Sequence, residues 1–269
     1  MTLRDRLISS FRIPKLTYRL WKVWRRDFDV FMKTYKSNFF PPLLEPIFYL
    51  FAMGFGLGNL VINIPGFNSY IQFIAPALVA ISMMYGSFFE CTYGSFFRMY
   101  YQKTFDAIIA TPVSVQEVIA GEILWGATRC VINSTIVLVI IAAFGLVTSP
   151  LALLIPLFAF VVGLMFSAIA MCFTAIAPNI DFFNYPGFLL ITPMFLLSGT
   201  FFPLGPPIPQ AVLIFADTFL PLTHAVNITR ALVIGNVGSY LLISIAWIAI
   251  VTVVFFVLSV NLMSRRLIK

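Results

Sequence analysis

The stretch GSYLLISIAWIAIVTVVFFVLSVNL, residues 238–262, contains no Asp, Glu, Lys or Arg in 25 residues. An α-helix rises about 1.5 Å per residue, so a helix of this length exceeds the roughly 30 Å of hydrocarbon in a bilayer. The stretch therefore predicts a transmembrane helix.

The rest of the chain has the same character. Of its 269 residues 61% are apolar and only 10% are charged, whereas soluble domains carry about 25% charged residues. A water-soluble core of this size could not cover so much apolar surface, so lipid must be the solvent. Five more apolar segments predict spans, at 39–61, 69–93, 121–146, 150–177 and 184–202. The predicted fold class is an all-α integral membrane protein with six transmembrane helices.

Residues 1–37 predict a cytoplasmic tail and an amphipathic interface helix over 14–36, ahead of a transmembrane domain at 38–269. At 100° per residue, one side of the helix is largely apolar and includes Trp21, Trp24 and Phe28; the other carries Lys15, Arg19, Lys22, Arg25, Arg26 and Lys33. We expect the aromatic side to lie in lipid and the basic side to face headgroups. Packing on a soluble domain is the alternative.

Lys and Arg predict the orientation, because they gather on the cytoplasmic side. Ten of the 17 lie in residues 1–37. Arg98 and Lys103 lie in the 94–120 connection, and Arg265, Arg266 and Lys269 lie in the tail, whereas 62–68 and 147–149 have none. Both termini are therefore expected in the cytoplasm. Charge that flanks a membrane in this way does not indicate a nucleic-acid partner, despite the net charge of +7.

Residues 203–237 do not resemble a span. They begin with four prolines and continue with two short apolar pieces, 211–220 and 224–234, joined at Pro221. Each piece is too short to cross, which predicts a re-entrant or interfacial helical hairpin on the outer side. Asp217 and His224 are its candidate site residues.

The 94–120 connection predicts a docking element. Thr111-Pro112 breaks one helix, and Ser114 with Glu117 forms a capping box that starts the next. A short helix at about 101–110 remains, with Phe105 and Ile109 as apolar anchors for a soluble partner. Lys103 and Asp106 are expected to set its register by charge. An interfacial helix without a partner is the alternative.

Glu45, Glu90 and Arg129 are ionisable residues that lie near or inside predicted spans. They fit contacts along a substrate path or an ion pair between helices. Snorkelling to the interface or local pairing would also explain them.

Several chemistries are excluded. No stretch reads GxxxxGK[ST], and none of the six lysines follows a glycine, so the chain lacks a phosphate-binding loop. There is one histidine, and the three cysteines (Cys91, Cys130 and Cys172) are scattered. We therefore predict no catalytic residue, no metal site, no disulfide and no cofactor bound by this chain. The scarcity of ionisable residues deep in spans weakens a proton-driven carrier.

Long ordered stretches resemble the permeases of ABC-2 type exporters, most of all the nodulation-factor export group; drug-export permeases look similar. They read EPIFYLFAMGFGLG (45–58), RMYYQKTFDAIIATPVS (98–114), APNIDFFNY (177–185), TPMFLLSGTFFPL (192–204) and LPLTHAVNITRALVIG (220–235).

This resemblance implies a non-enzymatic half-transporter in a bacterial or archaeal inner membrane. Two copies would pair with two separate ATPase subunits, which hold the ATP and Mg. The 101–110 helix would be the coupling helix, and 203–237 the outer hairpin. The cargo of the group is lipo-chitooligosaccharide, and relatives export glycolipids, polysaccharides or drugs. A self-contained secondary carrier, channel or membrane-embedded enzyme is the alternative function.

Overall fold

The computed structural model describes residues 14, 16–56, 58, 64, 67, 69–205 and 209–268. The predicted tail before residue 14, together with Lys15 and Lys269, lies outside the described residues. Within the described part every extended regular element is helical, and the only bridge is an isolated pair between Ile64 and Phe67.

The elements follow one another as α2 (Leu20–Lys33), α3 (Tyr35–Gly56), α4 (Tyr70–Phe89) with π-helical continuations η1 (Glu90–Gly94) and η2 (Phe97–Tyr101), α5 (Thr104–Ile109), α6 (Val115–Ala143), η3 (Pro150–Leu154), α7 (Ile155–Ile176), η4 (Ile180–Phe183), α8 (Asn184–Pro186), η5 (Gly187–Ile191), α9 (Thr192–Leu197), α10 (Gln210–Phe219), α11 (Pro221–Ile234) and α12 (Tyr240–Leu267).

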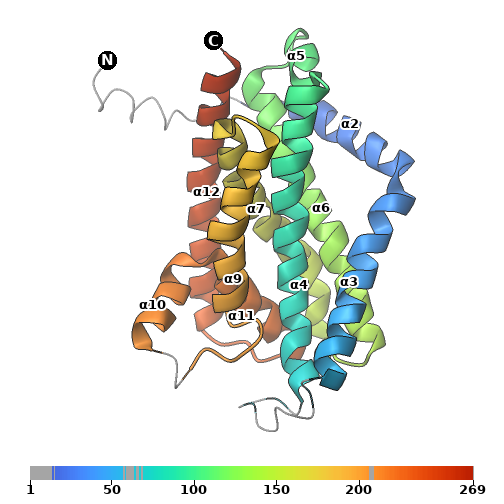
Figure 1. Cartoon of the computed structure of the whole chain (residues 1–269), viewed down its shortest axis with the longest axis vertical. Coiled ribbons are helices and arrows are strands. Elements are labelled where there is room, and N and C mark those ends of the chain that lie inside the picture. Colours follow the sequence, from blue (N-terminus) through green and yellow to red (C-terminus); the bar gives the residue numbers. More distant parts are fainter. Residues whose placement is uncertain are drawn as a thin grey trace.

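Five helical stretches are long and apolar enough to cross a membrane: 70–101, 115–143, 150–176, 180–197 and 240–267. They correspond to the last five predicted spans. The bent pair α10 and α11 would make a sixth if it crossed as one broken span. α3 has 22 residues in the place of the first predicted span and runs beside the bundle (Figure 1). It is not among the five, so its crossing stays a prediction.

One predicted boundary was wrong. The second span continues to Tyr101 instead of ending at 93. The capping box of Ser114 and Glu117 is confirmed and starts α6 before its apolar run begins. Arg98 therefore belongs to a helix and not to a loop. The helix continues through this charged residue, because the guanidinium of Arg98 pairs with the buried carboxylate of Glu122.

The core lies where α4, α6 and α7 meet, with α12 packed on α7. Gly126 of α6 permits this close approach, since a Cβ there would overlap Ser167 of α7 and Cys91 of η1. All three cysteines are free and buried.

The bent pair of helices α10 and α11 lies at one end of the molecule. Its helices α10 and α11 meet at a break bent by 86°. They lie at the end of the bundle opposite α5 and the C-terminus (Figure 1). This arrangement agrees with an outer hairpin and a cytoplasmic α5.

Cysteine labelling tests that orientation. Asn236→Cys, between α11 and α12, should react with a membrane-impermeant maleimide in intact cells. Ala107→Cys, on the exposed side of α5, should react only after permeabilisation; both positions are exposed. The native cysteines are buried and should give little background. Labelling of Ala107→Cys in intact cells would show that the orientation is the reverse of the predicted one.

Candidate functional site: a buried charge network

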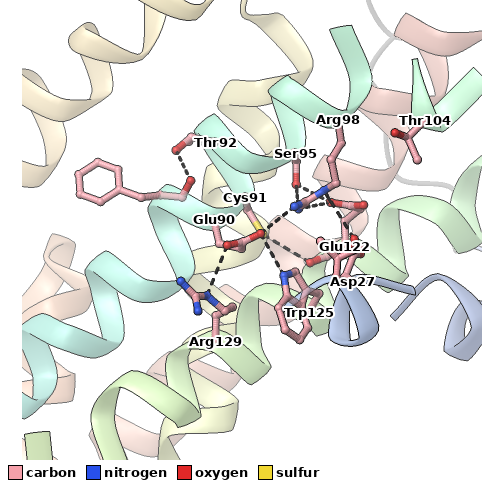
Figure 2. A network of polar contacts seen from close by, with 12 residues as sticks. Asp27, Glu90, Cys91, Thr92, Ser95, Arg98, Thr104, Glu122, Trp125 and Arg129 are labelled. Atoms are coloured by element: carbon pink, nitrogen blue, oxygen red, sulfur yellow. Dashed lines mark hydrogen bonds and ion pairs between the residues drawn. The ribbon is translucent and has the colours of Figure 1, made fainter. Parts of the chain in front are cut away.

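Six charged side chains meet where α2, the continuation of α4 and α6 come together. They form what we call the charge network: Arg26, Asp27, Glu90, Arg98, Glu122 and Arg129. Figure 2 labels five of them, all except Arg26. Three are positive and three are negative, so the network is neutral when all are ionised. The chain thus compensates the cost of burying charge by pairing opposite signs.

Glu122 of α6 is the centre of the network and is fully buried. One carboxylate oxygen accepts a hydrogen bond from Arg26 Nη2 at 2.9 Å. The other accepts from Arg98 Nη2 at 2.7 Å and from Ser95 Oγ at 2.7 Å. One side chain therefore joins the interface helix, the end of the second span and the start of the third.

The charged residues that the second span contributes to the network lie in its π-helical turns. Glu90 opens η1 and Arg98 lies in η2. Their side chains pair, with Arg98 Nη1 and Glu90 Oε1 2.8 Å apart. Single π-turns within α-helices occur frequently at functional sites. Two of them next to α5 mark this segment as a place where the helix departs from regular winding.

Asp27 of α2 is buried beside Glu122. Burial and the negative charge of Glu122 raise the pKa of Asp27 from 3.8 to about 7. The guanidinium groups of Arg98 and Arg26 act in the opposite direction and do not compensate, although Arg26 Nη2 lies 2.6 Å from Asp27 Oδ1. Asp27 therefore titrates near neutral pH.

This raised pKa predicts a pH dependence. The folded protein holds the proton of Asp27 more tightly than the unfolded chain. Its stabilising contribution is complete below about pH 4 and is lost as the pH rises through about 7. Thermal unfolding in detergent should show a fall in Tm between pH 5 and 8 that is smaller in Asp27→Asn. Equal slopes in the two proteins would contradict the assignment.

Glu90 and Arg129 form the ion pair between helices that was one of the readings from sequence. Arg129 Nε lies 3.5 Å from Glu90 Oε2. Glu90 Oε1 also accepts a hydrogen bond from Trp125 Nε1 at 3.0 Å. Arg129 stacks over Phe31, 4.8 Å from the ring centroid. Glu45 of α3 makes no hydrogen bond or ion pair through its side chain with the described residues, but it lines the same cavity as Glu90 and Arg129.

The interface helix was predicted to begin at residue 14 and to separate an aromatic side from a basic side. It begins at Leu20, and its buried face is made by Val23 and Asp27. Trp24 donates a hydrogen bond from Nε1 to Thr128 Oγ1 at 2.9 Å and is half-buried.

The aromatic side is only partly exposed. Trp21, Trp24 and Phe28 form a stack with centroids 4.1 and 5.3 Å apart, and Phe28 meets Trp125 of α6 edge-on. Trp21 alone is largely exposed, at 53%. The predicted headgroup contact of Arg26 was wrong, because its guanidinium turns inward to Glu122.

The predicted coupling helix is present as α5 but begins at Thr104 and not at 101. Lys103 directly precedes α5 and has a φ of 54°, a left-handed conformation. Phe105 was predicted as an exposed anchor, but its side chain is fully buried in the chain's own core. Ile109 is half-buried, and Lys103 and Asp106 are exposed. The surface that α5 offers to a partner is therefore more polar than predicted.

The two candidate residues of the hairpin lie close enough to interact, but they differ in burial. Asp217 is exposed on α10. His224 is buried, stacks on Trp247 of α12 at 4.4 Å and lies 3.2 Å from Ser244 Oγ through Nδ1. His224 therefore joins the hairpin to α12 instead of facing the outside.

Sequence reasoning missed Arg26, Asp27 and Glu122 as site residues, and also Arg230. Arg230 lies over Phe73 at 3.9 Å and donates from Nη2 to the carbonyl oxygen of Gly199 at 2.6 Å. The sequence could have indicated Arg230, because it is a single positive charge within the apolar segment 224–234. That segment is predicted on the outer side, where Lys and Arg are depleted. Nothing comparable marked Glu122, whose partners are remote in sequence.

No group of three His, Cys, Asp or Glu side chains in the described residues could hold a metal ion. The family model described as ABC-2 type transporter matches residues 18–234. The chain belongs to the ABC-2 type transporter family.

This ABC-2 permease resembles named relatives over most of its length. It is 36% identical to nodulation protein J of Rhizobium meliloti (strain 1021), over 91% of this chain and 92% of that protein. It is 35% identical to nodulation protein J of Rhizobium leguminosarum bv. viciae, over 92% and 94%. The inner membrane transport permease YadH of Escherichia coli (strain K12) is 23% identical over 72% of this chain and 75% of that protein. This chain is a multi-pass permease subunit and not the catalytic component.

Proposed function

We propose that this permease exports an amphipathic or glycolipid-type substrate from the cytoplasm, driven by a separate ABC ATPase. The observation that carries the proposal is the similarity to nodulation protein J over more than 90% of the chain. The working unit would contain two permeases and two ATPases in a bacterial or archaeal inner membrane, with both termini cytoplasmic. ATP and Mg would be bound by the ATPase.

The fold supports a mechanical role for α5. This short helix connects η2 to the start of α6. Arg98 lies in the element before it, and Glu122 lies in the helix after it, where the two pair at 2.7 Å. A displacement of α5 by a docked ATPase would therefore act on both sides of the charge network. Arg26 would pass that displacement to the interface helix, because it shares Glu122.

The exposed side of α5 would make the contact. Lys103 and Asp106 are exposed with opposite charges, which suits register at an interface rim. Phe105, in contrast, would hold α5 on the bundle so that its movement is transmitted.

Co-purification with a separate ABC ATPase from the same organism tests the proposal. The complex, reconstituted in liposomes, should move a fluorescent glycolipid only when ATP is supplied. The control is an ATPase whose catalytic glutamate is replaced, which should still bind but not transport. Transport by the permease alone would favour the self-contained carrier or channel instead.

A further inference from the structure

An apolar groove of about 610 Å³ lies between α2, α3 and α6. It shares no lining residue with the cavity of Glu45, Glu90 and Arg129. Its walls are mainly large apolar side chains from the three helices, among them Phe28, Met32, Phe39, Leu43, Ile136 and Val139. The volume falls within the range of about 300–1,000 Å³ that is typical of ligand pockets. The groove is therefore large enough to bind a ligand.

The walls of the groove favour an apolar occupant. No Asp, Glu, Lys or Arg of the described residues lines it. The amide of Asn38 does line it but is already bonded: its Oδ1 accepts from Arg129 Nη2 at 3.3 Å, and its Nδ2 donates to the carbonyl oxygen of Thr34 at 3.0 Å. A sugar or a charged group in the groove would lose hydration without gaining partners. A hydrocarbon chain meets no such cost.

The groove is open to the surroundings of the bundle. Met32, Phe39 and Val139 line it, and all three are exposed. Figure 1 shows α2 and α3 meeting at a corner on the outside of the bundle. Exposed apolar patches of this size mark interaction sites for proteins or membranes. In a permease whose helices cross a bilayer, lipid acyl chains have direct access to such a surface.

Positive charge lies next to the groove at this corner. Lys33 and Lys36 are exposed, and each directly follows a groove-lining residue, Met32 and Tyr35 respectively. No Asp or Glu lies between residues 30 and 44. Lysines beside a membrane surface attract anionic lipid headgroups, and their long stems let the ammonium groups reach the interface.

The two lysines also distinguish between possible occupants. A second copy in a two-fold contact would present the same patch, and its lysines would then face Lys33 and Lys36 with like charge. A zwitterionic lipid would bring its own ammonium group to the same place. An anionic lipid brings only negative charge to the lysines, while its chain covers the apolar walls.

We propose that the groove between α2, α3 and α6 binds an acyl chain of an anionic phospholipid, whose phosphate is held by Lys33 and Lys36. This inference goes beyond the proposed export function and does not depend on the cargo. The bound lipid would stabilise the corner between α2 and α3. Because Arg26 and Asp27 lie on α2, it would also support their position in the charge network.

Two lipids with identical palmitoyl and oleoyl chains test the head group: phosphatidylglycerol and phosphatidylethanolamine. Each is titrated against the full chain in detergent, and bound lipid is counted by native mass spectrometry. We expect phosphatidylglycerol to bind about ten-fold more tightly, because each lysine favours an anionic head. Lys33→Gln with Lys36→Gln should abolish this preference. The matched control, Lys22→Gln with Arg25→Gln, removes the same charge from exposed positions of α2 and should retain it.

Two outcomes of this titration would overturn the inference. One is equal affinity of the unaltered permease for the two lipids. The other is an equal loss of preference in both double variants, which would show that the basic charge of α2 as a whole attracts the lipid and that the corner is not a site.

A bulky side chain tests whether the acyl chain lies in the groove. Val139 is 63% exposed, so Val139→Trp should fill part of the groove without disturbing the core. It should weaken phosphatidylglycerol by about five-fold or more, the effect of one or two methylene groups that can no longer be buried. Ile250→Trp on α12 is the control, since Ile250 is 64% exposed and lies outside the groove. If the two variants bind phosphatidylglycerol equally tightly, the groove does not hold the chain and the inference is rejected.

Discussion

Glu122→Leu should sharply reduce the amount of folded permease in the membrane. Glu122 is fully buried and accepts from Arg26, Arg98 and Ser95. Removing one member of a buried pair typically costs about 3–5 kcal/mol, because the remaining charge is left without compensation. That is a large share of the about 5–15 kcal/mol that holds a typical protein folded. Membrane level and Tm in detergent are the measurements.

A double variant shows whether the loss comes from the stranded charge. Glu122→Leu with Arg98→Leu removes both partners of the 2.7 Å pair. It should recover part of the Tm lost in the single variant, as apolar replacements of buried ion pairs often do. The control is Asp29→Leu, an exposed carboxylate on α2, which should leave Tm within a few degrees. A stable Glu122→Leu protein would show that the network does not hold these helices together.

Phe105→Ala should separate the ATPase from the permease without removing the permease from the membrane. Phe105 is fully buried beneath α5, and truncating a buried Phe costs about 3–5 kcal/mol. α5 has only six residues, so this loss should release it from the bundle. The spans should remain, because α5 lies outside them. The measurement is co-purified ATPase per permease, with at least a ten-fold decrease expected.

A conservative change distinguishes support from direct anchoring. Phe105→Leu keeps most of the buried volume and should retain ATPase binding if Phe105 acts by packing α5 on the bundle. Asp106→Arg, on the exposed side, should weaken binding by reversing a rim charge while Tm stays unchanged. If Phe105→Leu loses the ATPase and Asp106→Arg keeps it, Phe105 must instead leave the core to contact the partner.

The charge network shows how far sequence reasoning reached at the site. Glu90 and Arg129 were selected because ionisable residues are rare near apolar spans, and an ion pair between helices was one of their readings. Glu122 was not selected, because its partners Arg26, Ser95 and Arg98 are remote in sequence and no local pattern indicates them. Arg26 was assigned to headgroups from its helical angle alone. A helical wheel gives the direction of a side chain but not the identity of the neighbour in that direction.

In the predicted coupling helix, too, the sequence indicated the helix but not the neighbour of its apolar residue Phe105. The Thr-Pro break and the capping box predicted that a short helix ends before α6 begins, since both signals act over a few residues. They could not show which face of that helix meets the bundle. Phe105 and Ile109 share a face, and the sequence alone does not distinguish a partner's groove from the chain's own core.

The sequence by itself determined that lipid is the solvent, where the apolar helices lie, that an amphipathic helix precedes them and that a bent pair of short helices follows the fifth. These features depend on composition and on patterns within about twenty residues. The tertiary structure decided the rest: Arg26 meets Glu122 across 96 positions of the chain, Arg129 reaches Asn38 across 91, and Phe105 turns inward. Partners so remote in sequence are chosen by the packing of whole helices against one another, which no local pattern records.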